Sequence, residues 1–354
     1  MNKHRVKLLK TLVEIPSPSG YEGRIVNFIK KYLSNYVSSK NMEVDFHNNL
    51  VVTIKGEEST KRIIIDAHAD TIGFLVNNID KEGYISLIPL GGIDKTIIRG
   101  RNILILTDTF DIEGVIGLKP IHLIDDEETE IPNKIVGVTA DIGVRKRKHV
   151  KRFIKIGDPV VFEPSFRKLL ENYVTGYGFD DKAGCFVLIE TIKEIVQNKL
   201  IPPYDLYFTF SAQEEIGCKG AKELVCRIRP NLFVGVDVTF ATDVEEVSER
   251  ETGRCELGKG IVIYRGVNID RQCTKLMLSL ARENKIKVQF QATNSVGYNA
   301  DEVAHKVGGI RVVNLAIPLR NMHSPVEIIN LRDLEFGIKL LKLFLTSKKL
   351  KDIL

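Results

Sequence analysis

The chain has 354 residues, enough for a large hydrophobic core and for two domains. Its content of 44% hydrophobic and 27% charged residues is ordinary for a globular protein, and a net charge of +5 is too small by itself to indicate nucleic-acid binding. It has neither an apolar run that could span a bilayer nor the apolar core of a signal peptide. Five scattered cysteines without a CxxC pair fit a reducing compartment, so we expect a cytoplasmic protein with no membrane association.

The first part of the chain predicts a helix and then a strand. Ser19 and Glu22 have the spacing of a helix-capping box, and apolar residues follow at helical intervals, at Ile25, Phe28, Ile29, Tyr32 and Leu33. A polar turn is expected over residues 56–60, and the apolar run 62–66 predicts a strand.

Residues 71–164 have a different pattern of apolar and turn-forming residues. Short apolar runs, among them YISLIPLGG, RNILILTD, GVIGLKP, NKIVGVTADIG and DPVVFEP, are separated by Gly, Asp and Pro. Runs of this length with turn residues between them are typical of a small all-β domain or barrel.

Beyond residue 164, helices and strands alternate. A helix is predicted over 182–197, and nearly continuous apolar runs predict strands over 206–210, 232–236 and 312–317. A closing helix is predicted over 331–345 with Asn330 as its N-cap. We therefore expect an α/β domain, residues 1–70 and 165–354, interrupted by a β insertion domain, residues 71–164.

Histidine and acidic residues fall where the predicted strands end or a helix begins. They are His68, Asp180 and Asp181, Glu214 and Glu215, Asp237, and His323. Ligands of open α/β sheets bind outside the carboxyl ends of the strands, so these side chains are expected at one edge of the sheet.

Two histidines and three carboxylates suit zinc, cobalt or manganese better than they suit a metal that prefers thiolates. Five ligands are too many for one catalytic zinc ion, which needs an open position, but they suffice for two ions that share a bridging carboxylate. The sequence therefore predicts a two-metal centre.

Acidic residues adjacent to the predicted metal ligands can orient a ligand or act as a base. Asp70 lies two residues after His68 in an extended segment, so its carboxylate can accept the second imidazole N–H. Of Glu214 and Glu215, one can bind metal while the other stays free as a general base. Taken singly, the same residues have plainer interpretations: Asp180 and Asp181 as helix N-caps, and the two glutamates as a solvated turn.

Across nearly its whole length the sequence resembles the metallopeptidases of the tetrahedral aminopeptidase and glutamyl aminopeptidase type. The resemblance rests on segments in the family's order: PSPSGYE, IDAHADTIGFLV, GVIGLKPIHL, ADIG, GDPVVFEP, GYGFDDKAGC, AQEEIGCKGA, GVDVT, ELGKG and MHSPVEIINLRDLE. It implies an enzyme that removes N-terminal residues from peptides, with a central mixed sheet flanked by helices and a PDZ-like dimerisation barrel. It also implies a homododecamer built from dimers.

The resemblance assigns a role to each site residue. His68, Asp180 and Asp237 would hold one ion, Asp180 would bridge, and Glu215 with His323 would complete the second site. Glu214 would be the general base and Asp70 the partner of His68. The bond between Asp180 and Asp181 would be cis. One departure is the pair Tyr298 and Asn299, which stands where the family usually has Thr-Asp and leaves the substrate preference open.

Three other functions compete with this interpretation. A related two-metal carboxypeptidase or deacylase would use the same ions and base. An inactive metal-binding scaffold is the second, and the presence of Glu214 argues against it. The basic run 145–152 raises a third, nucleic-acid binding, but the run has no aromatic residues for base stacking. We therefore favour a solvated segment of the insertion domain and expect no nucleic-acid partner.

Overall fold

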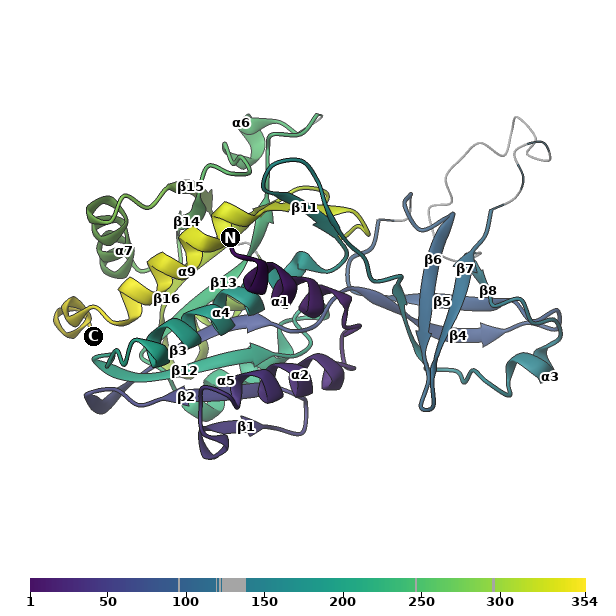
Figure 1. Ribbon diagram of the computed structural model, residues 1–354, viewed down its shortest axis with the longest axis horizontal. Coiled ribbons are helices and arrows are strands. Elements are labelled where there is room, and N and C mark those ends of the chain that lie inside the picture. Colours follow the sequence, from purple (N-terminus) through teal and green to yellow (C-terminus); the bar gives the residue numbers. More distant parts are fainter. Residues whose placement is uncertain (95, 119, 121, 123–137, 246, 295–296) are drawn as a thin grey trace.

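The computed structural model describes residues 1–94, 96–118, 120, 122, 138–245, 247–294 and 297–354. The chain forms an α/β body and, beside it, a smaller β-barrel (Figure 1). Among the described residues, no helix is both long enough and apolar enough to cross a membrane. The prediction of an α/β fold interrupted by a small barrel is confirmed.

The body is built on a mixed eight-stranded sheet. Its strands in spatial order are β1 (Met42–Val44), β2 (Leu50–Ile54), β12 (Tyr204–Ser211), β3 (Glu58–His68), β13 (Leu232–Phe240), β16 (Arg311–Leu319), β14 (Ile261–Gly266) and β15 (Val288–Thr293). The central strands β12, β3, β13 and β16 run parallel, so their carboxyl ends meet at one edge of the sheet.

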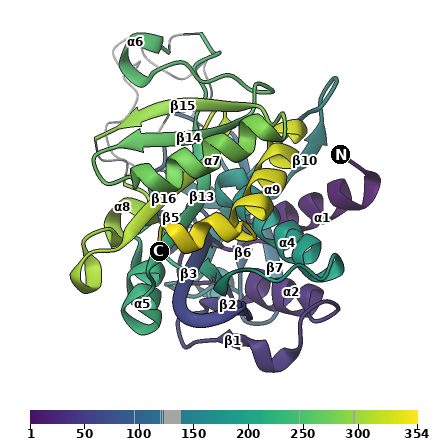
Figure 2. The ribbon, with the colours of Figure 1, turned by 90° about the vertical axis from the view of Figure 1, so that its left-hand side faces the viewer.

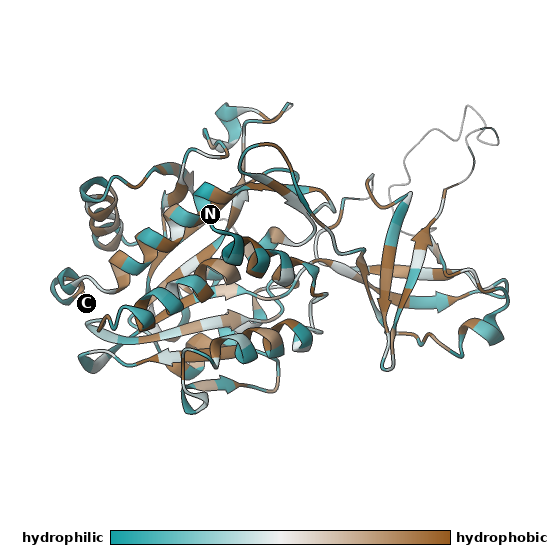
Figure 3. Cartoon of the chain, viewed as in Figure 1, coloured by the Kyte–Doolittle hydropathy of each residue, from teal (hydrophilic) through white to brown (hydrophobic). Residues whose placement is uncertain are grey.

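Helices cover both faces of this sheet, as the end-on view in Figure 2 shows. The larger core lies beneath α1 (Lys3–Glu14), α2 (Gly23–Leu33), α4 (Phe179–Gln197), α7 (Arg271–Glu283) and α9 (Leu331–Leu345). The opposite face packs against α5 (Lys219–Ile228) and α8 (Asn299–Val303). Because both faces are covered, the central strands are buried along most of their length, and their apolar stretches are brown in Figure 3.

The barrel is closed and antiparallel. In spatial order it consists of β4 (Gly73–Ile79), β5 (Ile85–Leu90), β8 (Thr139–Asp141), β7 (Asp111–Ile116), β6 (Arg101–Leu106) and β9 (Pro159–Phe162). Its core is aliphatic, with Phe74 and Phe162 in edge-to-face contact at 5.4 Å between ring centroids. Part of the predicted run 133–143 lies outside the described residues.

Short elements complete the chain. A small antiparallel sheet consists of β10 (Phe166–Lys168), β11 (Tyr173–Gly176) and β17 (Glu327–Asn330). The short helices are α3 (Arg147–Val150), α6 (Glu249–Thr252) and the 3-10 turns η1 (Ser39–Asn41), η4 (Lys306–Gly308) and η5 (Lys348–Asp352). The basic run thus forms α3 and its flanks, at the end of the barrel remote from the body (Figure 1).

Two local predictions are wrong. Glu22, not Ser19, is the residue that precedes α2, and neither side chain caps the helix. The polar segment 56–60 is not a turn: it contains one bend at Glu57, and β3 already begins at Glu58. The first residues of β3 are exposed, which explains why this part of a strand is polar.

Candidate metal centre

The predicted site residues converge at the carboxyl edge of the central parallel strands. His68 ends β3, Asp237 lies in β13, and Glu214 and Glu215 follow β12. His323 follows β16. Asp180 comes from the first turn of α4, which starts at the same edge. Asp237 was expected after its strand, but β13 continues to Phe240, so the side chain projects from within it.

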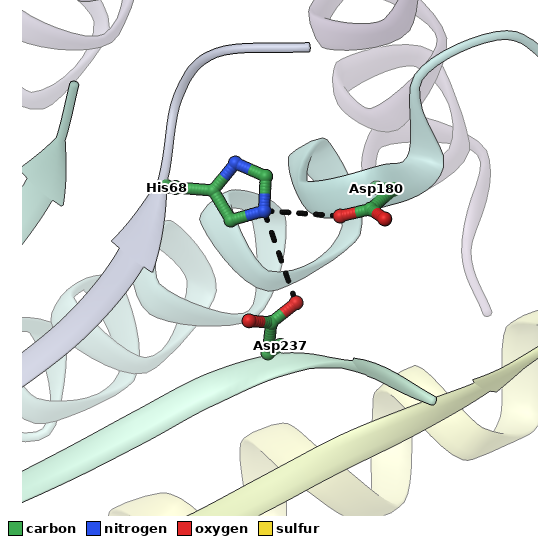
Figure 4. Close-up of side chains that lie close together, drawn as sticks. All are labelled: His68, Asp180 and Asp237. Atoms are coloured by element: carbon green, nitrogen blue, oxygen red, sulfur yellow. Dashed lines mark hydrogen bonds and ion pairs between the residues drawn. The ribbon is translucent and has the colours of Figure 1, made fainter. Parts of the chain in front are cut away.

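One group consists of His68, Asp180 and Asp237, shown in Figure 4. The Nε2 atom of His68 lies 3.0 Å from Oδ1 of Asp180 and 3.8 Å from Oδ1 of Asp237. All three side chains are buried, with one ligand atom from each within 4.8 Å of the others. The group can therefore hold a metal ion.

A second group shares Asp180 with the first. Its members are Asp180, Glu215 and His323, again with ligand atoms within 4.8 Å of one another. The Nε2 atom of His323 lies 3.2 Å from Oδ2 of Asp180 and 3.4 Å from Oε2 of Glu215. The two oxygens of Asp180 thus face different histidines, as a bridging carboxylate requires.

The electrostatics of the two groups fit cations. Burial raises the pKa values of Asp237 and Glu215 well above the usual carboxyl range, and the charge of Asp180 raises them further. Burial would do the same to Asp180, but hydrogen bonds with His323 and His68 keep its pKa below the usual value. Oε1 of Glu215 is buried without a hydrogen-bond partner among the described residues. A divalent ion would give this oxygen a ligand bond and offset the crowded negative charge.

Acceptors near the Nδ1 atoms fix the orientation of both histidine rings. The Nδ1 atom of His68 lies 3.1 Å from the main-chain oxygen of Asp70 and 3.4 Å from its Oδ1 atom. The Nδ1 atom of His323 lies 2.6 Å from the main-chain oxygen of Gly92. Each Nδ1 can therefore carry the proton, which leaves Nε2 free to bind a metal.

The Asp180–Asp181 peptide bond is cis, as the resemblance implied. The carboxylate of Asp181 belongs to neither group and accepts hydrogen bonds from the main-chain N–H groups of Gly184, at 2.8 Å, and His68, at 3.3 Å. A Cβ atom at Gly184 would lie 2.4 Å from the buried Asp181 carboxylate oxygens, so this position of α4 requires glycine. The N-cap interpretation therefore suits Asp181 but not Asp180.

Glu214 lies beside the first group. Its Oε2 atom is 3.9 Å from Nε2 of His68, and its side chain is 12% exposed. Burial raises its pKa above the usual carboxyl value, with the charges of Asp70 and Asp180 adding to the effect. The carboxylate belongs to neither metal-binding group, so it is free to take up a proton.

Three residues that support the site were not identified from the sequence. Ser19 Oγ donates to Oδ2 of Asp70 at 2.6 Å, and Oε1 of Glu22 accepts from the N–H of Gln213 at 3.1 Å. The two residues interpreted as a capping box thus support the site by hydrogen bonds to Asp70 and to the main chain of Gln213.

The third residue is Glu327 in β17, which is buried. Its carboxylate accepts from the N–H groups of Phe179, Asp180 and His323 at 2.7, 3.3 and 3.1 Å. Burial raises its pKa to about 8. The available signal was an acid within an apolar strand, four residues after His323.

Asn299, part of the departure from the family pattern, lies beneath the site. Its Nδ2 atom donates to Oδ2 of Asp66 at 2.8 Å and to Oγ of Ser211 at 3.1 Å. The neighbouring Tyr298 hydroxyl lies 3.0 Å from that of Tyr264. Both residues are therefore part of the packed layer around the site.

Comparison with known proteins identifies the family. The M42 glutamyl aminopeptidase family matches residues 48–340. A lysyl aminopeptidase of Pyrococcus furiosus is 30% identical over 351 residues, which cover 98% of each chain. Among solved structures, a TET aminopeptidase from a marine sediment archaeon of the Thaumarchaeota superposes with a TM-score of 0.92 at 27% identity, covering 99% of this chain and 98% of its own.

A second solved structure is the Pyrococcus horikoshii TET1 peptidase, which can assemble into a tetrahedron or a large octahedral shell. It superposes with a TM-score of 0.86 at 31% identity, covering 96% of this chain and 99% of its own. These matches show a hydrolase of peptide bonds, and the chain belongs to the M42 glutamyl aminopeptidase family.

Proposed function

We propose that this aminopeptidase works with two divalent metal ions. His68, Asp180 and Asp237 hold one ion, while Asp180, Glu215 and His323 hold the other. The observation that carries the proposal is the pair of distances at Asp180, with Oδ1 3.0 Å from His68 and Oδ2 3.2 Å from His323. Zinc or cobalt suits this set of imidazole and carboxylate ligands, and manganese is a third candidate.

Bound ions of this kind polarise the substrate carbonyl and lower the pKa of bound water. The chain supplies the acid–base chemistry. Glu214 Oε2 faces the metal-binding groups, where it can take a proton from the attacking water and give it to the leaving amine. Asp70 accepts from the N–H groups of Glu214 and Glu215, at 2.9 and 3.2 Å, so it fixes the base relative to the ligand.

The substrate proposed is the free N-terminus of a peptide. This rests on the family, whose relatives include an enzyme named for lysyl residues. A carboxypeptidase or deacylase would not require a free amine. Aminoacyl chromogenic substrates of different side chains should be hydrolysed, whereas their N-acetylated forms should not be. Equal rates on free and acetylated substrates would contradict aminopeptidase specificity.

The domain division and assembly belong to the same proposal. We assign residues 1–70 and 165–354 to catalysis and residues 71–164 to a PDZ-like dimerisation domain, an assignment supported by the closed barrel of β4–β9. Homo-oligomers, with dimers combining into a dodecamer, are supported by the likeness to the TET1 peptidase. All five cysteines are unpaired, which supports a cytoplasmic location.

Metal analysis tests the central claim. Protein stripped with a chelator, reloaded with Zn²⁺, Co²⁺ or Mn²⁺ and desalted should retain close to two ions per chain and regain turnover. His323→Ala should retain close to one ion. A maximum of one ion per chain in the wild type, unchanged in His323→Ala, would rule out the bridged centre.

A further inference from the structure

Cys218 has a backbone conformation that its side chain disfavours. It lies immediately before α5 with φ 54° and ψ 37°, in the left-handed region that glycine adopts freely and that other residues avoid. Its side chain makes no capping hydrogen bond to the helix. Helix capping therefore does not explain why a residue with a side chain stands here.

The thiol instead contacts the proposed base. Sγ of Cys218 lies 3.3 Å from Oε1 of Glu214 and 3.5 Å from the main-chain oxygen of Gly297, and the residue is 3% exposed. A thiol has one proton to donate, and a charged carboxylate is a stronger acceptor than a neutral carbonyl. The S–H group is therefore directed to Glu214.

The two carboxylate oxygens of Glu214 consequently have different surroundings. Oε1 receives the thiol, whereas Oε2 lies 3.9 Å from Nε2 of His68 and faces the metal-binding groups. Within the part of the chain that the structure describes, Cys218 is the one side chain that donates a hydrogen bond to this carboxylate.

Main-chain hydrogen bonds also connect Cys218 with Glu214. The N–H groups of Gly217 and Cys218 both donate to the main-chain oxygen of Glu214, at 2.9 and 2.8 Å. The backbone of Glu214 is thus fixed from Asp70 on one side and from Cys218 on the other. The remaining freedom is rotation of the Glu214 side chain, and the thiol restrains it.

We propose that Cys218 is a positioning residue that keeps Oε2 of Glu214 directed at the reacting centre. The inference rests on the proposed function, in which Glu214 is the general base. A thiol is a weak donor, so it can orient the carboxylate while leaving it free to exchange a proton. Cys218 itself touches neither metal-binding group and transfers no proton.

Three substitutions test this role. Cys218→Gly and Cys218→Ala remove the donor, and glycine also relieves the left-handed backbone, so a loss of activity in that variant cannot come from backbone strain. Both should lower kcat roughly five- to twentyfold, the range expected for one lost hydrogen bond, with KM within about twofold. Metal content should remain that of the wild type. Cys218→Ser keeps a donor and should recover most of kcat.

Cys273→Ala is the matched control, because Cys273 is another buried cysteine near the start of a helix, in the first turn of α7, and lies outside the site. It should leave kcat and KM unchanged. Wild-type kcat in both Cys218→Gly and Cys218→Ala would overturn the positioning role. Equal loss in Cys218→Ser and Cys218→Ala would also overturn it, because the hydrogen bond would then be irrelevant.

A double-mutant cycle separates this inference from the proposed function. In a Glu214→Gln background, Cys218→Gly should cause no further loss of the residual turnover, since the thiol acts through the carboxylate. An additional loss there would place its action elsewhere. Near-normal turnover in Glu214→Gln alone would contradict the proposed base. An inactive Glu214→Gln beside fully active Cys218 variants would contradict only the positioning role.

Discussion

The Oδ1 atom of Asp70 accepts a hydrogen bond from the main-chain N–H of Glu214 at 2.9 Å. The sequence predicted that this carboxylate would serve the imidazole of His68, but Nδ1 of that ring lies closer to the main-chain oxygen of Asp70 than to its carboxylate. The Asp70 carboxylate instead accepts hydrogen bonds from the main-chain N–H groups of Glu214 and Glu215 and from the Ser19 hydroxyl. Asp70 therefore connects the first metal-binding group with the proposed base.

Asp70→Asn is expected to lower turnover by roughly 10- to 100-fold, as is typical when a group that orients metal ligands is altered. The amide keeps the shape but has one acceptor oxygen in place of two, so one of its N–H contacts is lost. The protein should remain folded by circular dichroism. Turnover within twofold of the wild type would show that the carboxylate is not needed to fix the loop.

Glu214 and Glu215 should be distinguishable although they are adjacent. Glu214→Gln keeps shape but loses basicity, so turnover should fall by roughly 10²–10⁴-fold, the usual range for a lost acid–base group. Both ions should be retained. Glu215→Ala should instead lower metal content and also the Tm of the metal-loaded protein, because bound metal stabilises the folded state. Metal content and turnover measured on the same preparations decide between the roles, and loss of an ion from Glu214→Gln would reverse the assignment.

Glu194 in α4 is expected to stabilise the fold in a pH-dependent manner. It is partly buried, which alone would raise its pKa, but Lys342 at 2.6 Å and Arg5 at 2.8 Å lower the pKa below the ordinary value. The folded state therefore binds the proton less well than the unfolded state. The stabilisation is present above the ordinary pKa of 4.5 and is lost as the pH falls through the lowered value.

Glu194→Gln should accordingly lower Tm by about 1–3 °C at pH 7, and the difference should shrink as the pH falls below the ordinary carboxyl pKa. Thermal melts of both proteins across this pH range provide the measurement. Glu82→Gln, an exposed residue of the barrel, is the control and should show no such change. A Tm difference that is equal at all pH values would exclude the ion pairs as its cause.

The basic segment 145–152 is expected to be dispensable for chemistry. Most of its side chains are exposed, and α3 lies at the end of the barrel remote from the α/β body (Figure 1). Replacing Lys146, Lys148 and Lys151 with Glu should leave kcat on a dipeptide within about twofold, because exposed charges at this distance are screened. A large fall in kcat with unchanged oligomeric state would contradict this. A change in assembly or in hydrolysis of long peptides would not.

Long, regular elements could be predicted from the sequence because their own residues determine them. Helix α9 begins and ends where its apolar spacing predicted, and Asn330 caps it by accepting from the N–H of Arg332. The apolar runs of the barrel likewise contain strands, from ISLIPL in β5 to PVVF in β9. The convergence of His68, Asp237 and the other candidate ligands could be anticipated because parallel strands bring their carboxyl ends together.

Contacts between distant segments could not be predicted in this way. Ser19 and Glu22 have the pattern of a local cap, yet the Ser19 hydroxyl donates to Asp70, and Glu22 accepts from the distant N–H of Gln213 in addition to the local N–H of Gly20. Glu327 accepts hydrogen bonds from three main-chain N–H groups, and two of them, in Phe179 and Asp180, are distant from it in the sequence. The role proposed for Cys218 could not be predicted from a single cysteine in the sequence, because it depends on the turn that brings the thiol to Glu214.

The loop Gly91–Gly92, which leaves the barrel strand β5, reaches the body at the second metal-binding group. Gly92 supplies the main-chain oxygen for Nδ1 of His323, and a Cβ atom at Gly91, whose φ is +80°, would lie 3.2 Å from Oε2 of Glu215. The barrel thus meets two of the three residues of the second group, His323 through a hydrogen bond and Glu215 through close packing. In the proposed two-ion centre, the orientation of the barrel and the affinity for the second ion would therefore be linked: a contact that holds the barrel in place would also hold His323 in place for the ion.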